Sequence, residues 1–309
     1  MARCFVTRRL PGPALDRLGR LHDVDVWPER LPPSYAQLCR RAADADGLLS
    51  LLSDRVDAAL IAGSPRLRAI SNYAVGYDNV DLQAAAARRI PVGNTPDVLT
   101  DTTADLAFAL LLAAARGLSS AEASVRGGDW VTWDPALHLG YDVHGATLGI
   151  IGGGRIGQAV ARRAEGFSMT VLIAGRAGPT PLAELLERSD FVSIHCPLTA
   201  GTRHLIDAAA LARMRDTAIL INTARGPIVD QRALVAALHD GTIAGAALDV
   251  TDPEPPAPGD PLLAAPHLLL VPHIGSATHA TRERMADLAV ENLIAALAGR
   301  PMPNAVGVR

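Results

Sequence analysis

Short apolar runs alternate along the whole chain with longer segments in which apolar residues recur at helical spacing. In the first part of the chain, the runs that predict strands cover residues 4–7, 24–27, 47–52, 69–71 and 91–93. In the second part they cover residues 148–151, 170–174, 191–194, 218–221, 244–248 and 268–271. Strands that alternate with helices are typical of α/β proteins with parallel sheets. The pattern therefore predicts two Rossmann-like, doubly wound domains.

Two longer helical patterns mark the borders of these domains. One helix is expected from about Thr102 to Arg126, capped by Asp101 or Thr100, as the crossover between the domains. A final helix is expected over residues 281–298, and it would return to the first domain. We expect residues 1–98 with 281–309 to form a substrate (catalytic) domain and residues 99–280 to form a dinucleotide-binding domain. The active-site cleft would lie between them.

A glycine-rich turn follows the first strand of the second domain. The apolar run 148–151 and the helical segment 158–164 enclose Gly152, Gly153, Gly154, Arg155, Ile156 and Gly157. Between a strand and a helix, this spacing is typical of a dinucleotide site, where glycines allow the tight turn and the close approach of a pyrophosphate. The pyrophosphate would lie at the helix N-terminus, where free N–H groups favour an anion.

The end of the next strand bears on which dinucleotide binds. NAD sites have an acidic residue about 20 residues after the glycines, whereas NADP sites accommodate the 2′-phosphate with arginine. Here the strand is followed by Gly175 and Arg176, and the next carboxylate is Glu184. A guanidinium binds phosphate in two hydrogen bonds. NADP(H) is therefore favoured, with NAD(H) possible, and the alternative is that Arg176 is a solvated arginine.

Polar residues follow the other strands of the second domain, and ligands of open α/β sheets bind beyond these strand ends. They are His195, Cys196, Pro197, Asn222, Thr223, Ala224, Arg225, Asp249 and His273. Glu254 lies in the loop after Asp249. A histidine can move a proton, a neighbouring carboxylate can favour its protonated form, and an arginine can bind a carboxylate. Arg225, Glu254 and His273 on one rim predict a 2-keto-acid reductase, although each alone could be structural, as we expect His195 to be.

Composition narrows the class of protein. The chain has 309 residues, is 49% hydrophobic and carries a net charge of −3, which argues against disorder and nucleic-acid binding. It contains no lysine, which excludes a Schiff-base lysine and a P-loop lysine. The three cysteines follow no metal or disulfide pattern, so no metal site is expected. With a first strand starting at once and no long apolar span, we expect a cytoplasmic protein without a membrane partner.

Several segments together resemble the D-isomer-specific 2-hydroxyacid dehydrogenases, and the resemblance extends over essentially the whole chain. Besides the glycine turn, they are residues 71–81 (SNYAVGYDNVD), 94–101 (NTPDVLTD), 222–226 (NTARG) and 272–278 (PHIGSAT). Within that family the chain is most similar to the glyoxylate/hydroxypyruvate reductases. That likeness rests on residues 248–255 (LDVTDPEP), 130–135 (WVTWDP) and 301–303 (PMP).

The resemblance implies a role for each site residue. Arg225 would bind the carboxylate and carbonyl of the keto acid, helped by the backbone N–H groups of Val75 and Gly76. Leu51 and Leu52 would form a wall of the substrate pocket. His273, paired with Glu254, would protonate the carbonyl oxygen as hydride arrives, giving the D-2-hydroxy acid.

The resemblance also implies the cofactor contacts and the assembly. Asp249 and Thr223 would contact the nicotinamide end, with Thr103 near it, whereas Pro197 and Thr202 would line the path of the adenosine and pyrophosphate. The residues expected to bind the cofactor are Thr103, Gly152, Gly153, Gly154, Arg155, Ile156, Gly157, Gly175, Arg176, Cys196, Pro197, Thr202, Thr223, Ala224, Asp249 and Gly275. Family members dimerise through the nucleotide domain, so a homodimer is expected, with Trp133 near the partner's active site.

The chain departs from the family's pattern after Arg176, where roughly a dozen residues of helix and strand are missing and no second basic residue follows. Dual use of NADP(H) and NAD(H) therefore stays open. Alternative functions are a reductase for another 2-keto acid, such as 2-ketogluconate or phenylpyruvate, and a non-catalytic dinucleotide-sensing regulator. Phosphoglycerate dehydrogenase is disfavoured because no regulatory domain follows Arg309.

Overall fold

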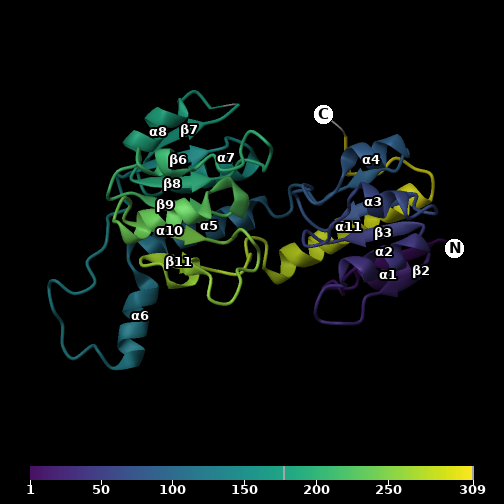
Figure 1. Cartoon of the computed structure of the whole chain (residues 1–309), viewed down its shortest axis with the longest axis horizontal. Coiled ribbons are helices and arrows are strands. Elements are labelled where there is room, and N and C mark those ends of the chain that lie inside the picture. Colours follow the sequence, from purple (N-terminus) through teal and green to yellow (C-terminus); the bar gives the residue numbers. More distant parts are fainter. Residues whose placement is uncertain (177, 308–309) are drawn as a thin grey trace. The chain divides into compact units, whose positions relative to one another are not determined.

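The computed structural model describes residues 1–176 and 178–307. The chain forms two compact units, one made of Met1–Leu99 with Ser276–Arg309 and the other of Thr100–Gly275. Each unit contains one six-stranded sheet (Figure 1). The predicted α/β fold, with two doubly wound sheets, is confirmed.

The sheet of the first unit is almost entirely parallel. Its strands are β1 (Arg3–Val6), β2 (Asp23–Val26), β3 (Gly47–Ser50), β4 (Ala69–Asn72), β5 (Val92–Gly93) and β12 (Ala305–Val306). They are arranged in the order β12-β5-β4-β3-β1-β2. Only β12 runs antiparallel to its neighbour, and no strand had been expected in this segment. The carboxyl ends of β3 and β4 therefore lie side by side at one edge of the sheet.

Helices pack on both faces of this sheet because each buries one apolar stripe against it. They are α1 (Ala14–Gly19), α2 (Tyr35–Ala43), α3 (Ala58–Ala62), α4 (Leu82–Ala87) and α11 (His279–Leu297). Ser34 begins α2 with a capping box to Gln37. Thr278 caps α11, which packs against β3 and β4 even though it is the last helix of the chain. The final helix thus belongs to the first unit.

The sheet of the second unit is parallel throughout. Its strands are β6 (Thr147–Ile151), β7 (Thr170–Ala174), β8 (Phe191–Ile194), β9 (Ile219–Asn222), β10 (Gly245–Leu248) and β11 (Leu268–Leu270). They are arranged in the order β11-β10-β9-β8-β6-β7, so the chain order reverses beside β6. In such sheets ligands bind beyond the carboxyl ends of the strands, at the point where the order reverses. The glycine turn directly after β6 lies at this point.

The helices of the second unit include one break that the sequence pattern did not indicate. They are α5 (Thr100–Ala115), α6 (Leu118–Gly127), α7 (Arg155–Glu165), α8 (Leu182–Arg188), α9 (Ala208–Leu211) and α10 (Gln231–His239), with 3₁₀ turns η1 (Gly226–Ile228) and η2 (Pro261–Ala264). The single helix expected from about Thr102 to Arg126 is wrong, because α5 and α6 meet at a bend of 59°. Gly117 adopts the left-handed conformation (φ 56°) that commonly ends a helix.

No single helix in the described part of the chain is long and apolar enough to cross a membrane. Only the bent pair of α5 and α6 passes that test, by length and composition alone. Helix α5 packs against α7, β9 and β10, so its apolar side chains form part of the core of its unit.

Candidate active site

The glycine-rich turn between β6 and α7 has the geometry that its spacing predicts. Gly152 adopts a φ of +107°, and a Cβ atom there would lie 2.6 Å from the backbone nitrogen of Cys196. A Cβ atom on Gly157 would lie 2.1 Å from the carbonyl oxygen of Gly152, so only glycine lets α7 pack this closely. Nothing lies within 4 Å of a Cβ position on Gly154, the N-cap of α7. The turn therefore leaves open space in front of a helix N-terminus, which fits a phosphate group.

The ends of β9, β10 and β11 form a row on the same edge of the sheet. Leu248 at the end of β10 is paired with Asn222 of β9 on one side and with Leu270 of β11 on the other. The residues after these three strands thus start from neighbouring positions. The sequence indicates no role for Asn222. Its side chain donates to the carbonyl oxygen of Arg225 (2.9 Å) and accepts from the N–H of Ala224 (3.0 Å).

Arg225 lies in a loop that packs tightly on the chain after β10. Its side chain is partly buried and donates to the carbonyl oxygen of Ala224 (2.8 Å). A Cβ atom on the next residue, Gly226, would lie 1.9 Å from the carbonyl oxygen of Thr251. Glycine is therefore required here, and the close contact fixes the Arg225 loop beside the loop that carries Glu254.

His273 and Glu254 contact each other directly. The imidazole Nδ1 atom lies 2.5 Å from a carboxylate oxygen of Glu254, with the two side chains 22% and 34% exposed. His273 has a left-handed backbone conformation (φ 51°), which turns the chain sharply after β11. With Nδ1 bonded to the carboxylate, Nε2 is left to exchange a proton with a substrate. The predicted histidine–carboxylate pair is thus present in the structure.

Asp249 stabilises the turn that presents His273. Its carboxylate accepts hydrogen bonds from the N–H groups of Ile274 (2.6 Å) and Gly275 (2.8 Å), while its carbonyl oxygen accepts from the N–H of His273 (2.9 Å). Burial raises the pKa of this carboxyl, and the two N–H groups and His273 oppose that shift. A Cβ atom on Gly275 would lie 3.4 Å from Thr103 at the start of α5. Thr103, Asp249 and Gly275 are therefore neighbours.

A buried hydroxyl beside these residues has no partner. The side-chain oxygen of Thr223, the residue after β9, is buried and makes no hydrogen bond within residues 1–176 and 178–307. Buried polar atoms are nearly always bonded, so an unpartnered one at the carboxyl end of a parallel strand fits a site that receives a polar group. This orphan hydroxyl, the open glycine turn and the parallel strand ends together fit a dinucleotide.

Comparison with known proteins decides the family. Residues 108–275, more than half of the chain, match the family described as D-isomer specific 2-hydroxyacid dehydrogenase, NAD binding domain. A glyoxylate reductase of Korarchaeum cryptofilum is 50% identical, with 98% of this chain and 95% of that protein covered. The chain belongs to the D-isomer-specific 2-hydroxyacid dehydrogenases. It is therefore an oxidoreductase with an NAD-binding domain.

Solved structures are similar to this dehydrogenase over its whole length. The TT0316 protein of Thermus thermophilus is 50% identical, with a TM-score of 0.92 and 98% and 99% of the two chains covered. An NADPH-dependent glyoxylate/hydroxypyruvate reductase of Sinorhizobium meliloti, solved with NADP and malonate, is 36% identical, with a TM-score of 0.87 and 99% and 96% covered. The second likeness covers both units of the dehydrogenase.

In the dehydrogenase, Arg176 is exposed just after β7. The residue before it, Gly175, has a φ of +121°, and its Cβ position would be 3.7 Å from Gly152 of the glycine turn. Gly178 donates its N–H to the carbonyl oxygen of Gly175 (3.0 Å), so the chain turns back at once toward α8. Ala177 lies outside the described residues. Arg176 thus starts from a backbone position close to the predicted pyrophosphate site.

The residues after β8 form the other side of the glycine turn. His195 bonds through Nε2 to the Ser193 hydroxyl (2.8 Å), and burial lowers its pKa to about 4, so the ring is neutral near pH 7. Burial raises the pKa of the Cys196 thiol to about 11, which leaves it protonated and unreactive. The hydroxyl of Thr202 donates to the carbonyl oxygen of Pro197 (2.7 Å) and fixes the loop between them.

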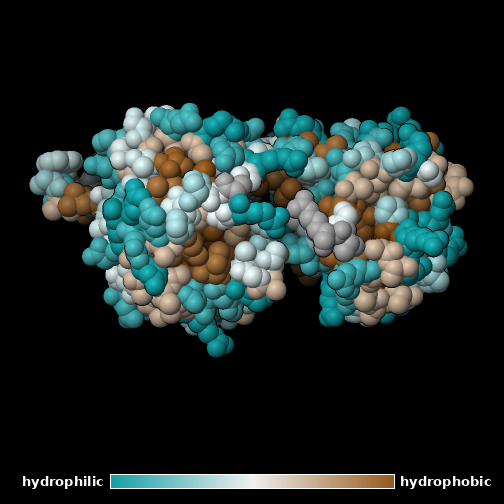
Figure 2. Space-filling view, turned by 90° about the horizontal axis from the view of Figure 1, so that it is seen from above, coloured by the Kyte–Doolittle hydropathy of each residue, from teal (hydrophilic) through white to brown (hydrophobic). Residues whose placement is uncertain are grey.

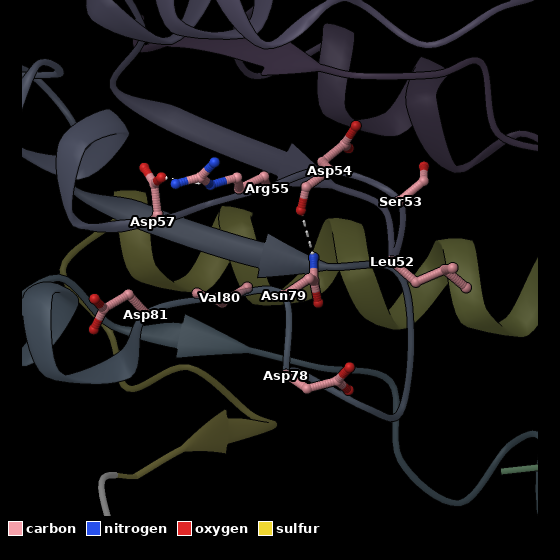
Figure 3. A pocket seen from close by; sticks show the side chains of 9 residues that line it. All are labelled: Leu52, Ser53, Asp54, Arg55, Asp57, Asp78, Asn79, Val80 and Asp81. Carbon is pink, nitrogen blue, oxygen red and sulfur yellow. Dashed lines mark hydrogen bonds and ion pairs between the residues drawn. The ribbon is translucent and has the colours of Figure 1, made fainter. Parts of the chain in front are cut away.

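The residues expected to line the substrate pocket lie in the other unit of the dehydrogenase. Leu51 and Leu52 follow β3, and Val75 and Gly76 follow β4, so both pairs come from neighbouring strand ends. A shallow pocket of about 390 Å³ lies beside Leu52. Figure 3 shows Asn79 in this pocket pointing toward the loop of Asp54, to whose carbonyl oxygen it donates (2.9 Å).

Proposed function

We propose that this dehydrogenase reduces a small 2-keto acid, glyoxylate or hydroxypyruvate, to the D-2-hydroxy acid. The observation that carries the proposal is the 2.5 Å contact between His273 and Glu254 at the strand edge of an NAD-binding unit. The names of the relatives from Korarchaeum cryptofilum and Sinorhizobium meliloti support this substrate class. An acid–base pair, a carboxylate-binding arginine and a dinucleotide site are the parts that such a reduction needs.

In the proposed mechanism, the nicotinamide dinucleotide supplies the hydride when bound, and the side chains supply orientation and the proton. Arg225 binds the substrate carboxylate in two parallel hydrogen bonds, which places the keto carbon. His273 donates a proton from Nε2 to the carbonyl oxygen and takes it back in the oxidative direction. Glu254 keeps the imidazole oriented through Nδ1 and stabilises its protonated form.

The cofactor is proposed to occupy the unit Thr100–Gly275. The glycine turn at Gly152–Gly157 would bind the pyrophosphate, and the row of Thr103, Thr223 and Asp249 would contact the nicotinamide end. Residues 1–98 with 281–309 would then bind the substrate through the backbone at Val75 and Gly76. The unpartnered Thr223 hydroxyl and the open space at Gly154 support this assignment.

NADP(H) is the proposed preferred form, with NAD(H) as a possible second cofactor. Arg176 is exposed after β7 at the place where an NAD site would have a carboxylate. The NADP-bound relative from Sinorhizobium meliloti supports the proposal. A single guanidinium in a shortened segment gives a weaker phosphate site than two basic residues would, which is why the preference need not be strict.

A homodimer is proposed, formed through the segment that follows α5. Helix α6 has no buried residue, and the chain after it exposes several large apolar side chains. The largest exposed fractions there belong to Val131 (90%), Leu139 (78%) and Trp133 (77%). Figure 2 shows this segment as the protrusion at the left, with apolar surface on it. An apolar arm of this kind is typical of a protein–protein contact, and a second copy of the chain is the proposed partner.

Initial rates of NADPH and NADH oxidation, measured side by side with glyoxylate and hydroxypyruvate, test this function. Rapid turnover with NADPH is expected, and slower turnover with NADH. Turnover with NADH alone would keep the reaction and contradict the role of Arg176. If neither keto acid is reduced with either cofactor, a wider panel including 2-ketogluconate and phenylpyruvate decides between another keto acid and a non-catalytic sensor.

A further inference from the structure

Three successive carbonyl oxygens in the loop after β4 each accept a hydrogen bond from a residue outside that loop. The carbonyl oxygen of Ala74 accepts from the backbone N–H of Thr95 (2.9 Å). The carbonyl oxygen of Val75 accepts from the side-chain amide of Asn94 (2.8 Å). The next carbonyl oxygen, on Gly76, accepts from the side-chain amide of Asn72 (2.9 Å). The backbone of this loop is therefore bonded at every peptide unit.

These bonds also set the direction of the backbone N–H groups. A peptide unit is planar and trans, so its N–H points away from its C=O. The bond from Asn94 to the Val75 carbonyl thus orients the N–H of Gly76, and the bond from Thr95 to the Ala74 carbonyl orients the N–H of Val75. Both N–H groups are directed away from the residues that bond the carbonyls.

Asn94 is itself firmly fixed in the unit. It is 7% exposed, and its backbone N–H donates to the carbonyl oxygen of Asn304 (3.1 Å). Its own carbonyl oxygen accepts from the side chain of Asn292 in α11 (2.9 Å). The Asn292 side chain in turn accepts from the N–H of Asn304 (3.1 Å). With its backbone bonded on both sides, the Asn94 amide has little freedom to leave the Val75 carbonyl.

Asn72 connects this loop to the loop of Leu51. The Asn72 side chain is fully buried, accepts from the Ser50 hydroxyl (3.0 Å) and donates to the side-chain oxygen of Asn79 (3.0 Å). Asn79 donates to the carbonyl oxygen of Leu51 (3.0 Å). The N–H of Leu51 donates to the carboxylate of Asp54 (2.7 Å), which is buried at the same place. A network of amide groups, with Asn72 fully buried and Asn79 partly buried, therefore supports both loops.

We infer that Asn94 and Asn72 are positioning residues for the substrate carboxylate, and that Asn94 acts by orienting the Gly76 N–H. This inference rests on the proposed function, because it takes the substrate to be a small acid bound at Val75 and Gly76. Neither asparagine touches the substrate. The Asn94 amide keeps the Gly76 N–H in a fixed direction, and the Asn72 amide fixes the next peptide unit of the loop through the Gly76 carbonyl. Binding the carboxylate then requires no reordering of the loop.

The chemistry of the side chain at position 94 provides the test. An aspartate has nearly the same shape as asparagine, yet its ionised form has no donor for the Val75 carbonyl. Two oxygens would then face each other, and the peptide unit would rotate away from its present direction. A protonated aspartate regains one O–H donor. The loss in the Asn94→Asp variant should therefore be reversible by acid, which a simple packing defect would not be.

The experiment measures keto-acid reduction by the full chain with saturating NADPH from pH 5 to pH 8. For Asn94→Ala we expect the KM for hydroxypyruvate to rise about tenfold, with a smaller fall in kcat and an unchanged Kd for NADPH. A tenfold loss corresponds to one buried hydrogen bond of about 1.4 kcal/mol. For Asn94→Asp we expect a larger rise at pH 8 that shrinks toward pH 5. Dividing the KM of the variant by the wild-type KM at each pH removes the pH dependence that both proteins share.

The matched control is Ser64→Ala, which removes another fully buried hydrogen bond of the same unit, from the Ser64 hydroxyl to the carbonyl oxygen of Leu60 (2.8 Å). Its KM should stay within twofold of the wild-type value. An unchanged KM in Asn94→Ala, or equal pH dependence in Asn94→Asp and wild type, would overturn the positioning role while leaving the proposed function intact. A wild-type protein that reduces no keto acid would contradict the proposed function itself, and this inference with it.

Discussion

At the scale of single residues, the contact between His273 and Glu254 makes a specific prediction. Glu254→Gln removes the negative charge that stabilises the protonated imidazole but leaves a hydrogen-bond partner at the same place. We expect kcat/KM for keto-acid reduction at pH 7 to fall about 10- to 100-fold. His273→Ala should cost about 10²- to 10⁴-fold, as is typical for loss of a general acid.

A second carboxylate in the same loop provides the control for this pair. Asp252 pairs with Arg203 at 3.8 Å instead of with His273, so Asp252→Asn makes the same chemical change two residues away. Its kcat/KM should stay close to the wild-type value. Equal losses in Asp252→Asn and Glu254→Gln would show that the loop responds to any charge change, and the acid–base role of the pair would then be wrong.

Arg176 carries the prediction about the cofactor. If its guanidinium binds a 2′-phosphate, Arg176→Ala should raise the KM for NADPH about 10- to 100-fold, which corresponds to a charge-assisted hydrogen bond of about 1.5–3 kcal/mol. The KM for NADH should hardly change, because NADH has no phosphate there. Arg188→Ala, which removes an exposed arginine paired with Glu184 in α8, is the control. Similar losses with both cofactors would contradict the phosphate role.

At the scale of elements, the sequence predicts a strand best where apolar residues form a continuous run. The predicted strands 170–174 and 191–194 have the same bounds as β7 and β8, which pair with β6 on either side. The two-residue strand β12 carries almost no local pattern and forms only because it pairs with β5. The break between α5 and α6 depends on one left-handed residue, Gly117, inside a helical pattern. The sequence therefore did not predict β12, which depends on strand pairing, or the break between α5 and α6, which depends on one backbone angle.

The same contrast holds for the candidate site. Arg225, Asp249 and His273 could be selected from the sequence because each follows a parallel strand, and the ends of parallel strands share an edge. The contact between His273 and Glu254 could not be predicted from the sequence, because it depends on the path of the loop after β10. The bond from the Asn94 amide to the Val75 carbonyl joins the loops after β5 and β4, and it depends on a side-chain direction that no spacing rule indicates.

The burial of His195, which follows β8, leads to a prediction about stability in acid. Burial lowers the folded-state pKa of His195 to about 4, from an ordinary value of 6.5. Between these values the unfolded chain binds more protons than the folded one, so the free energy of unfolding rises with pH. The contribution of His195 is thus complete above pH 6.5 and is lost as the pH falls toward 4. His195→Gln, which can still bond to Ser193, should flatten this dependence in denaturant unfolding measured from pH 4 to pH 7.

His22 and the carboxyl of Asp249 also titrate in acid, so the comparison of variant and wild type is what isolates His195. Burial lowers the pKa of His22, which adds a slope of the same sign, whereas burial raises the pKa of Asp249, which adds one of opposite sign. Both groups are the same in the two proteins. An unfolding free energy with the same pH slope in wild type and His195→Gln would mean that the ring stays accessible to protons in the folded state.

At the scale of the whole molecule, the exposed segment after α6 predicts the assembly. Side chains such as Val131 and Leu139 are 90% and 78% exposed in the single chain, and removing apolar surface from water is favourable by about 25 cal/mol per Å². We expect the wild-type protein to sediment as a dimer at micromolar concentration. The double variant Val131→Glu with Leu139→Glu should sediment as a monomer, because charges at an apolar contact would have to be desolvated without partners.

A control variant at a similarly exposed leucine is available on the other unit. Leu31 is 72% exposed but lies far from residues 128–141 in the chain, so Leu31→Glu introduces one such charge on a surface with no proposed partner. This variant should stay dimeric. If Trp133 also contributes to the partner's active site, the monomeric double variant should lose keto-acid reduction while still binding NADPH, since the glycine turn lies within one chain. A wild-type monomer, or a Leu31→Glu variant that dissociates equally, would show that the segment after α6 does not form the dimer contact.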